Sequence, residues 1–176
     1  MKNEYEVRGD ITAIIINSPK YGRKEALINT SKLQRAKDFP NTWYVSWNRI
    51  TKSFYVYGAT YENRKEKRVH LHRWVTNDNR GMIVDHFNHE TLDNTDLNLR
   101  IVTGSGNQQN KKSANKNSKS GIRGVHWCRL YNKWVARITI ERKTIHVGYF
   151  ETIDSAEVAV LKARKKYMPN SQEASA

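Results

Sequence analysis

The sequence predicts an α+β protein, and three observations support this fold class. Segments rich in aromatic and β-branched residues recur at strand length in both halves of the chain. One segment near the carboxyl end instead places Ala156, Val160 and Ala163 on one face at helical spacing. The 176 residues include five Trp and nine Tyr, so small cores can form although only 38% of the residues are hydrophobic.

Residues 1–68 are predicted to form a β-rich amino-terminal region. The candidate strands are 12–16, 42–47 and 53–58, and the last two are separated by a segment of hairpin length. A short helix is expected over 32–38.

Residues 69–112 form a second block, in which Ser105 and Gln108 have the spacing of a capping box and predict a helix start at Ser105. Its other predicted elements are a short helix over 69–75, a strand over 82–87, a polar loop over 88–96 and a strand over 97–102.

The polar, basic segment 113–120 is interpreted as a linker, with a frayed helix end as the alternative. Residues 121–168 then predict three antiparallel strands followed by one helix, which Thr152 or Asp154 caps and Pro169 ends. The strands are 124–127, 133–140 and 144–148. Residues 169–176 are expected to be a disordered tail.

Composition excludes several protein classes. No apolar run approaches the roughly 18 residues that span a bilayer, so an integral membrane protein is not expected. An anionic membrane is the second choice of partner after nucleic acid, but no basic amphipathic helix with a bulky apolar face is evident, so no membrane partner is expected. The first residues lack the apolar segment of a signal peptide, which predicts a cytoplasmic protein. Cys128 is the only cysteine, which leaves no internal disulfide and no thiolate-based zinc site.

The net charge of +14 is concentrated in the second half of the chain. Residues 100–168 hold 15 Lys and Arg against four Asp and Glu, a difference of +11. A surface of one sign repels itself, so a polyanion is the expected partner, and nucleic acid is the first choice. A basic protein without such a partner is the alternative.

Asp85, His86, Asn98 and Asn107 are the residues most able to carry chemistry. The strand, loop, strand and helix order would bring the four together. Asp and Asn oxygens can hold one hard divalent cation, and a neighbouring His can act as general base. Asn98 could orient the His86 imidazole. Each signal alone is weak, because an Asp-His pair is often structural and Asn residues often form turns.

The same stretch closely resembles the HNH endonucleases of phages and mobile introns, in their His-Asn-Asn subgroup. The resemblance covers residues 69–112, and the segments that carry it are Leu71-His72-Arg73, Val84-Asp85-His86-Phe87-Asn88, Thr91-Leu92-Asp93-Asn94, Asn98-Leu99-Arg100-Ile101-Val102-Thr103 and Asn107-Gln108-Gln109-Asn110. It implies a ββα-metal (His-Me finger) nuclease module without zinc. His86 would be the general base, Asn98 its orienting partner, and Asp85 and Asn107 the ligands of Mg²⁺ or Mn²⁺.

Two departures from the family pattern lie in the loop. His89 stands where the family usually has Gly, and Phe87 where it has Ile. His89 is therefore a candidate additional site residue, with a solvated loop residue as the preferred alternative. His72 belongs to the family pattern, and packing under the sheet is its simplest role.

The carboxy-terminal strands predict a DNA-reading face. Alternation turns Trp134, Ala136, Ile138 and Ile140 toward the helix and Arg137 and Thr139 away from it. In the next strand it turns Ile145 and Val147 inward and Thr144 and His146 outward. A cationic, partly aromatic sheet face can enter a major groove. A solvated face is the alternative.

This block resembles the DNA-binding domain of plant ethylene-response factors, the Apetala type, over residues 118–168. The matching segments are Arg123-Gly124-Val125, Lys133-Trp134-Val135-Ala136-Arg137-Ile138 and His146-Val147-Gly148-Tyr149-Phe150-Glu151-Thr152. Arg137, Thr139 and His146 differ in type from the family residues, so the recognised base sequence cannot be transferred. The predicted DNA-binding residues of the whole chain are Arg100, Lys111, Lys112, Arg123, Trp127, Arg129, Tyr131, Arg137, Thr139, Lys143, Thr144 and His146.

The sequence thus predicts a site-specific, homing-type DNA endonuclease that acts as a monomer on double-stranded DNA in a bacterial or phage-infected cell. The first alternative is a sequence-specific DNA-binding regulator with an inactive nuclease motif. The second is an RNA-binding protein.

Overall fold

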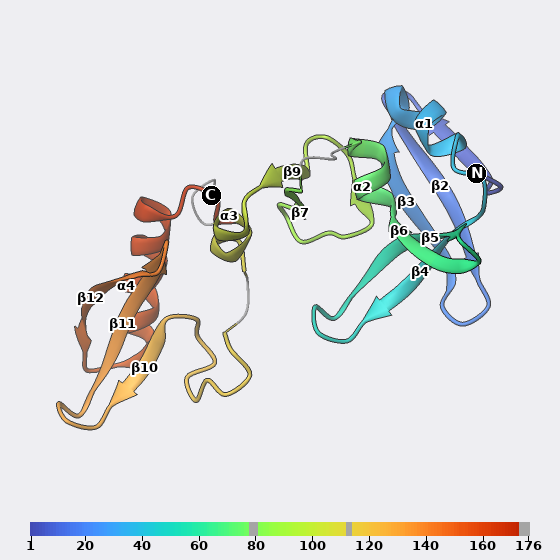
Figure 1. Cartoon of the computed structure of the whole chain (residues 1–176). Coiled ribbons are helices and arrows are strands. Elements are labelled where there is room, and N and C mark those ends of the chain that lie inside the picture. The colour runs from blue at the N-terminus through green and yellow to red at the C-terminus, as the bar shows by residue number, and fades with distance from the viewer. Residues whose placement is uncertain (78–80, 112–113, 173–176) are drawn as a thin grey trace. The chain divides into compact units, whose positions relative to one another are not determined.

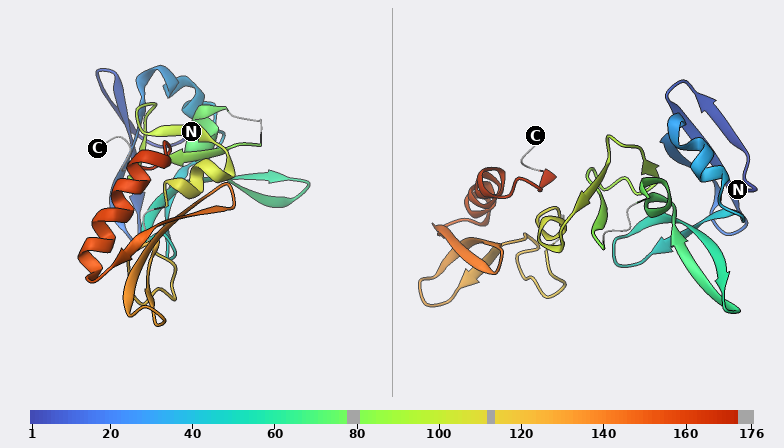
Figure 2. Two further views of the ribbon diagram at one scale, coloured as in Figure 1. Left: turned by 90° about the vertical axis from the view of Figure 1, so that its left-hand side faces the viewer. Right: turned by 45° about the horizontal axis from the view of Figure 1, so that its top comes forward.

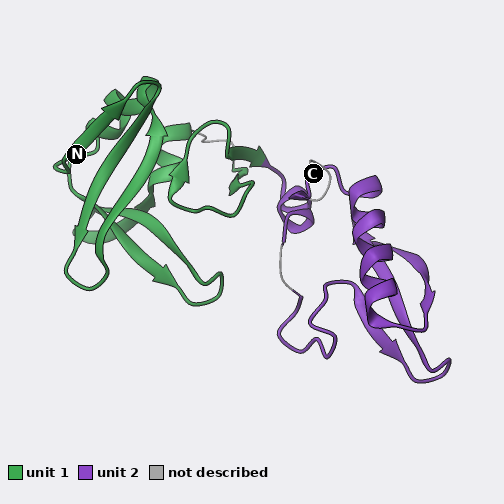
Figure 3. Cartoon of the chain, turned by 180° about the vertical axis from the view of Figure 1, so that it is seen from behind, with its two compact units in different colours: residues 1–101 green, residues 102–176 purple. Residues whose placement is uncertain are grey.

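The computed structural model describes residues 1–77, 81–111 and 114–172, and the chain divides into two compact units, 1–101 and 102–176 (Figure 3). Both units combine strands with helices (Figure 1), which confirms the predicted α+β class. The helices in the described part of the chain are all too short or too polar to cross a membrane.

The first unit begins with a four-stranded sheet in the order β1-β2-β3-β8. Strands β1 (Tyr5–Arg8), β2 (Ile11–Ser18) and β3 (Gly22–Asn29) pair antiparallel, and the two-residue strand β8 (Asp93–Asn94) joins β3 in parallel. Strand β2 contains the predicted strand 12–16. The sequence did not predict β1 and β3, because β1 is exposed throughout and the first half of β3 carries polar side chains.

A second sheet has the order β4-β5-β6. It consists of β4 (Trp43–Asn48), β5 (Ser53–Glu62) and β6 (Lys65–His70), and the β5–β6 hairpin projects from the body of the unit (Figure 2). Strand β6 passes without a loop into α2 (Leu71–Thr76). The helix expected over 69–75 therefore begins two residues later than predicted, since Val69 and His70 complete β6.

The core of the first unit lies between the two sheets and the helices that join them. The short 3₁₀ helix η1 (Thr30–Lys32) and α1 (Leu33–Lys37) confirm the helix expected over 32–38. Phe39 and Trp43 are fully buried and stack with ring centroids 4.0 Å apart. A side chain at Gly58 would begin 2.2 Å from the Phe39 ring, so β5 needs glycine at this contact.

A two-stranded sheet, β7 (Ile83–His86) and β9 (Leu99–Val102), completes the first unit. Both strands lie within the segments predicted as strands. The connection between them is the expected polar loop, but it also supplies β8, so this loop is built into the sheet of the amino-terminal region.

The second unit contains a three-stranded antiparallel sheet covered on one face by a helix, as predicted. The elements are β10 (Val125–Cys128), β11 (Lys133–Ile140), β12 (Lys143–Phe150) and α4 (Ile153–Tyr167). Val125, Ala136, Ile138, Ala156 and Val160 form the centre of its core. The Thr152 hydroxyl accepts a hydrogen bond from the Ser155 amide at 3.2 Å, which confirms Thr152 as the cap.

Helix α3 (Gly104–Gln109) also belongs to the second unit. It starts one residue before the predicted Ser105, and the cap is Thr103, whose hydroxyl accepts from the Gly106 amide at 3.1 Å. The predicted cap residue, Ser105, was therefore wrong, and Thr103 is the cap. Thr103 has the extended backbone conformation that a cap needs, whereas Ser105 is already helical.

The segment after α4 is not a disordered tail up to Gln172. Met168 and Ser171 are buried, and Asn170 donates two hydrogen bonds to the Gln109 side chain of α3. Because α3 is anchored in this way, the boundary between the two compact units falls inside the predicted block 69–112. Residues 173–176 lie outside the described part.

Candidate functional site

Asp85 and His86 are the last two residues of β7. Successive residues of a strand point to opposite faces. Asp85 accordingly contacts Arg100 of β9, while the His86 ring lies against Tyr55 of β5 and His72 of α2. His86 is buried, with 5% of its surface exposed.

Asn98 stabilises the loop that follows His86 instead of contacting its ring. The Asn98 side-chain oxygen accepts from the Asn88 amide at 2.9 Å, and its side-chain nitrogen donates to the carbonyls of Glu90 (3.1 Å) and Asp93 (2.8 Å). Its main-chain oxygen accepts from the Phe87 amide at 2.8 Å. The predicted direct contact between Asn98 and the His86 imidazole is therefore wrong. Asn98 instead acts on the position of His86 through the main chain of the loop.

Asn94 is the residue that contacts the imidazole. The His86 Nε2 and Asn94 Oδ1 atoms are 3.3 Å apart. The Asn94 side-chain nitrogen donates to the Leu92 carbonyl at 3.0 Å, which fixes the orientation of the amide. Oδ1 can only accept, so Nε2 must carry the proton. The lone pair of neutral His86 then lies on Nδ1, the nitrogen able to take a proton.

His86 is the end of a row of three histidines. The ring centroids of His86 and His72 are 4.8 Å apart, as are those of His72 and His70. Tyr57 lies 4.5 Å from His70, and Tyr55 is within 6.3 Å of all three imidazoles. His72 is the middle member of this row and packs against both of the other imidazoles. The packing role expected of His72 therefore accounts for part of the arrangement.

Burial keeps this row uncharged. Desolvation is the main cause that lowers the pKa of His70, His72 and His86, and for His72 the value falls to about 2. The other histidines add to this effect at His70 and His72. At His86 the Asn94 hydrogen bond and the Asp85 charge act in the opposite direction, but the pKa stays below the ordinary value of 6.5.

The Asp85 carboxylate pairs with Arg100. The Arg100 Nη2 atom is 3.0 Å from Asp85 Oδ2, and the two side chains are 23% and 15% exposed. Arg100 was predicted to bind DNA, but its guanidinium is engaged within the first unit. The positive charge of Arg100 thus neutralises Asp85, the proposed metal ligand.

The expected metal ligands are a carboxylate, Asp85, and an amide, Asn107. Both offer oxygen atoms, which Mg²⁺ and Mn²⁺ prefer. The described ranges contain no cluster of three or more His, Cys, Asp or Glu side chains arranged for a metal. Asp85 is paired with Arg100, and Asn107 belongs to the second unit, so the binding of one divalent ion by both residues stays a prediction.

Asn107 lies on α3 in the second unit, where it is partly buried and its amide donates to the Thr103 carbonyl at 2.9 Å. Its pairing with Asp85 at one ion remains a prediction. His89 has a φ of +66°, a conformation that glycine adopts without strain. This explains why glycine suits the position and supports the loop-residue interpretation of His89.

The outer face of the carboxy-terminal sheet has the predicted composition. Arg137 pairs with His146 and Thr139 with Thr144, and all four are exposed. The two threonine hydroxyls are 3.2 Å apart. Paired residues of antiparallel strands share a face, so these side chains form one surface.

A β-bulge adds Tyr149 to this outer face. The register between β11 and β12 shifts at Ala136 and Arg137. Strict alternation would turn Tyr149 toward α4, but the bulge places it opposite Val135. Its ring lies 4.7 Å from His146 and 4.9 Å from Tyr131. The same bulge leaves Val147 in the core, as predicted, whereas Ile145 is 36% exposed.

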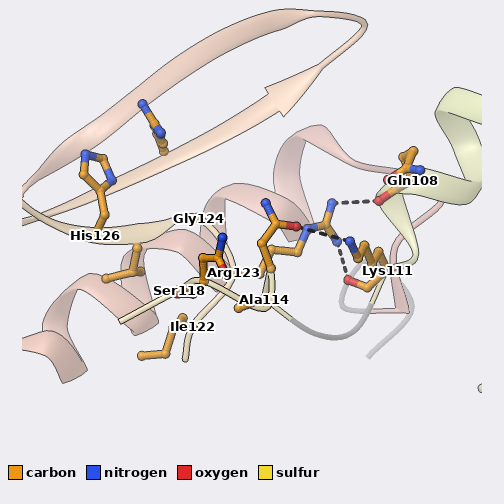
Figure 4. A pocket seen from close by; sticks show the side chains of 12 residues that line it. Gln108, Lys111, Ala114, Ser118, Ile122, Arg123, Gly124 and His126 are labelled. Atoms are coloured by element: carbon orange, nitrogen blue, oxygen red, sulfur yellow. Dashed lines mark hydrogen bonds between the residues drawn. The ribbon is translucent and has the colours of Figure 1, made fainter. Parts of the chain in front are cut away.

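Arg123 has a structural role in the second unit. Its guanidinium donates to the main-chain carbonyls of Gln108 (2.7 Å) and Lys111 (Figure 4), and also to that of Gln109 (3.0 Å), all at the end of α3. These contacts satisfy carbonyls that a helix end leaves without partners. Arg123 thus caps α3 in this structure, and its DNA-binding role stays a prediction.

A pocket of about 370 Å³ lies beside Arg123 (Figure 4). His126, Arg137 and Lys111 line it, and none of the described residues that line it is acidic. Lys111 is exposed and donates to the Asn115 side chain at 3.3 Å. Lys112, another predicted contact, lies outside the described residues.

Trp127 differs from the other predicted contacts of the sheet. It pairs with Trp134, at a ring distance of 5.2 Å, and so belongs to the face that packs on α4, although it is 42% exposed. Arg129 and Tyr131 are exposed in the β10–β11 turn, and Lys143 is exposed at the start of β12.

Comparison of the chain with protein-family models, with curated proteins and with solved structures returned no match. The arguments for function below therefore depend on the residues and their geometry.

Proposed function

We propose that this chain is a site-specific, homing-type DNA endonuclease that hydrolyses phosphodiester bonds with one divalent metal ion, Mg²⁺ or Mn²⁺. The observation that carries the proposal is the geometry of His86. A buried imidazole is held neutral, its proton is fixed on Nε2 by Asn94, and the Asp85 carboxylate is its neighbour in sequence. A neutral imidazole in a defined tautomer can take a proton from the attacking water in phosphodiester hydrolysis.

In the proposed mechanism, His86 Nδ1 accepts a proton from the attacking water. Asn94 holds the ring in the required tautomer, and Asn98 holds the loop that positions the ring. Asp85 and Asn107 would supply oxygen ligands to the metal ion. When bound, a divalent ion would stabilise negative charge at the scissile phosphate.

The carboxy-terminal sheet is proposed to bind double-stranded DNA. Arg137, His146, Thr139 and Thr144 lie on one exposed face, and Tyr149 joins them. Arginine can read guanine edges and threonine can contact thymine methyl groups in a major groove. The cationic pocket beside Arg137 suits a backbone phosphate.

A nicking assay tests the enzymatic proposal. We expect the wild-type protein to cut DNA that contains its genomic target in the presence of Mg²⁺. His86→Ala should reduce the rate about 10²–10⁴-fold, the usual contribution of a general base. The matched control is His89→Gly, which removes a nearby imidazole from the loop after β7, at a position whose φ suits glycine.

The alternative function is a sequence-specific DNA-binding regulator. The occupation of Asp85 by Arg100 is the observation that favours it, because a permanent ion pair would exclude a metal. In that case wild type and His86→Ala would bind DNA equally and leave it intact with either Mg²⁺ or Mn²⁺. An RNA-binding protein would instead release DNA when competitor RNA is added, and alanine at Arg137 would weaken its binding to RNA.

A further inference from the structure

One face of the β4–β5–β6 sheet carries a group of tyrosines. Trp43, Val45 and Val56 of this sheet belong to the core of the first unit, so the residues that alternate with them point to the opposite face. The register between the strands places further residues of β6 on that same face. We call this surface the tyrosine face, and it consists of Tyr44, Tyr55, Tyr57, Arg68 and His70.

The tyrosine face leads to His86. Tyr44, Tyr57 and His70 form one row across the three strands. The ring centroids of Tyr44 and Tyr57 are 6.1 Å apart, and those of Tyr57 and His70 are 4.5 Å apart. Tyr55 lies 5.9 Å from His86. The face is therefore continuous with the residue proposed as the general base.

The tyrosine hydroxyls are available to a ligand. Within the ranges that the structure describes, no residue forms a hydrogen bond with the hydroxyl of Tyr44, Tyr55 or Tyr57, and none of the three oxygens is buried. Desolvation is the main cause that raises the pKa of Tyr57, so its hydroxyl keeps the proton that it can donate. Tyrosine hydroxyls are common donors to the phosphate oxygens of DNA.

Arg68 adds positive charge to the tyrosine face. Its Nε atom is 3.5 Å from Glu66 Oε1, and the two side chains are 64% and 47% exposed, so this is a weak surface pair. Its terminal guanidinium nitrogens have no partner among the described residues. Residues 62–68 hold four Lys and Arg against two Glu. The chemistry of this face therefore suits an anion with several oxygen acceptors, as a phosphate has.

We propose that the tyrosine face binds the sugar–phosphate backbone of the target DNA beside the phosphate that is cut. The hydroxyls of Tyr44, Tyr55 and Tyr57 donate to phosphate oxygens, and the Arg68 guanidinium pairs with a phosphate. This inference rests on the proposed function, because it concerns how DNA is held at His86. It gives the amino-terminal strands a role in positioning the substrate, since backbone contacts fix register without reading bases.

DNA binding by the full-length protein in EDTA tests the charged contact, because no metal-dependent cutting then occurs. Fluorescence anisotropy with a duplex from the genomic target gives the Kd at several salt concentrations. Arg68→Gln should raise the Kd about threefold to tenfold and reduce the slope of log K against log salt concentration by about 0.9. Lys67→Gln is the matched control, because Lys67 is equally exposed and points to the other face of β6. Equal effects of the two variants would overturn the proposal.

Tyr57→Phe tests the hydroxyl contact and keeps the ring that packs on Tyr44 and His70. It should raise the Kd about threefold to tenfold, whereas Tyr5→Phe, which alters an exposed tyrosine of β1, should not. Stacking of bases on the ring predicts a different result. In that case Tyr57→Phe would bind like the wild type and only Tyr57→Leu would bind more weakly, and this result would also overturn the proposal.

Ethylation of single DNA phosphates separates this inference from the proposed function. A phosphate whose ethylation weakens binding by the wild type, but not by Arg68→Gln, is the partner of Arg68. It should lie next to the nick that the wild type makes with Mg²⁺, and a partner phosphate distant from the nick would overturn the proposal. If the wild type nicks DNA but both variants bind normally, only this inference fails. If both variants bind weakly and the wild type makes no nick, the enzymatic proposal fails and the phosphate contacts stand.

Discussion

Asn94 is a buried amide whose two ends make different contacts. Its side-chain nitrogen donates a hydrogen bond to the Leu92 carbonyl, and its side-chain oxygen accepts a hydrogen bond from His86 Nε2. The sequence made Asp85 and His86 easy to find because they are adjacent. It did not single out Asn94, because asparagine is common in this polar loop and only the pairing of β8 with β3 buries this one.

Substitutions of Asn94 should shift the pH dependence of cleavage in opposite directions. The acid limb should lie below pH 6.5 in the wild type, because the pKa of His86 is lowered and the base must be neutral. Asn94→Ala removes a contact that raises this pKa, so the limb should move lower and the rate should fall about 10–100-fold, as when a supporting partner is lost. Asn94→Asp should move it higher. Measured pH–rate profiles that coincide would contradict the assignment of the tautomer.

His72 predicts an acid sensitivity of folding. Its pKa is about 2 in the folded protein and near 6.5 when unfolded, so the unfolded state binds the extra proton. The free energy of unfolding should therefore fall as pH drops below 6.5, by about 1.4 kcal/mol per pH unit for this residue. Urea denaturation between pH 7.5 and 5 measures the slope. His72→Phe should make it shallower, and an unchanged slope would exclude His72 as its source.

At the scale of elements, Gly58 controls how β5 meets α1 and β4. A Cβ atom there would lie 2.2 Å from Phe39 and 2.9 Å from Trp43, which are both fully buried. Gly58→Ala should lower the free energy of unfolding by about 1–3 kcal/mol, as overpacking of a core does. Gly104→Ala is the control, because no atom lies within 4 Å of the added methyl group. Thermal denaturation compares the two variants, and equal stability would show that the core adapts.

The bulge in β12 turns Tyr149 to the outer face of the sheet, and we predict that Tyr149 contacts DNA there. Strict alternation along the strand would have assigned it to the opposite face. Tyr149→Ala should weaken binding to target DNA about fivefold to twentyfold, or about 1–2 kcal/mol, because it removes an aromatic side chain from the centre of the outer face. Tyr167→Ala, which removes a comparably exposed tyrosine from α4, should have little effect. Electrophoretic mobility shifts measure both, and equal losses would argue against a specific role for Tyr149.

Elements were predictable where side-chain patterns were strong. Strands β2, β4, β5, β7, β9 and β10–β12 and helices α1 and α4 follow their hydrophobic patterns. Strands β1, β3 and β6 are held mainly by hydrogen bonds to neighbouring strands, and exposed charged residues such as Lys65 conceal β6. The bulge was also beyond prediction, because one additional residue in a register leaves no mark in composition.

For the whole molecule, most of the positive charge and the proposed general base lie in different units. The excess of +11 over residues 100–168 lies almost entirely in the second unit, whereas His86 and Asp85 lie in the first. That one unit cuts DNA and the other binds it stays a prediction. The sequence placed the boundary between the units elsewhere, because the contacts of α3 with Arg123 and Asn170 are made by residues distant in sequence.

Salt dependence should reveal which unit contacts phosphates. Each phosphate contact contributes about −0.9 to the slope of log K against log salt concentration. A truncated protein with residues 102–176 should retain most of the slope of the full chain and cut nothing. Filter binding at several salt concentrations measures both slopes. A truncated protein that loses most of the slope would move the DNA-binding surface to the first unit.

The row of imidazoles also bears on protein engineering. Its members come from β6, α2 and β7, and tyrosines of β5 line it. A chimaera that transplants only residues 69–112 into a new host would lose Tyr55, Tyr57 and the β3 edge on which Asn94 rests. A portable segment that keeps these contacts must therefore begin no later than β3, so part of the amino-terminal region belongs to it.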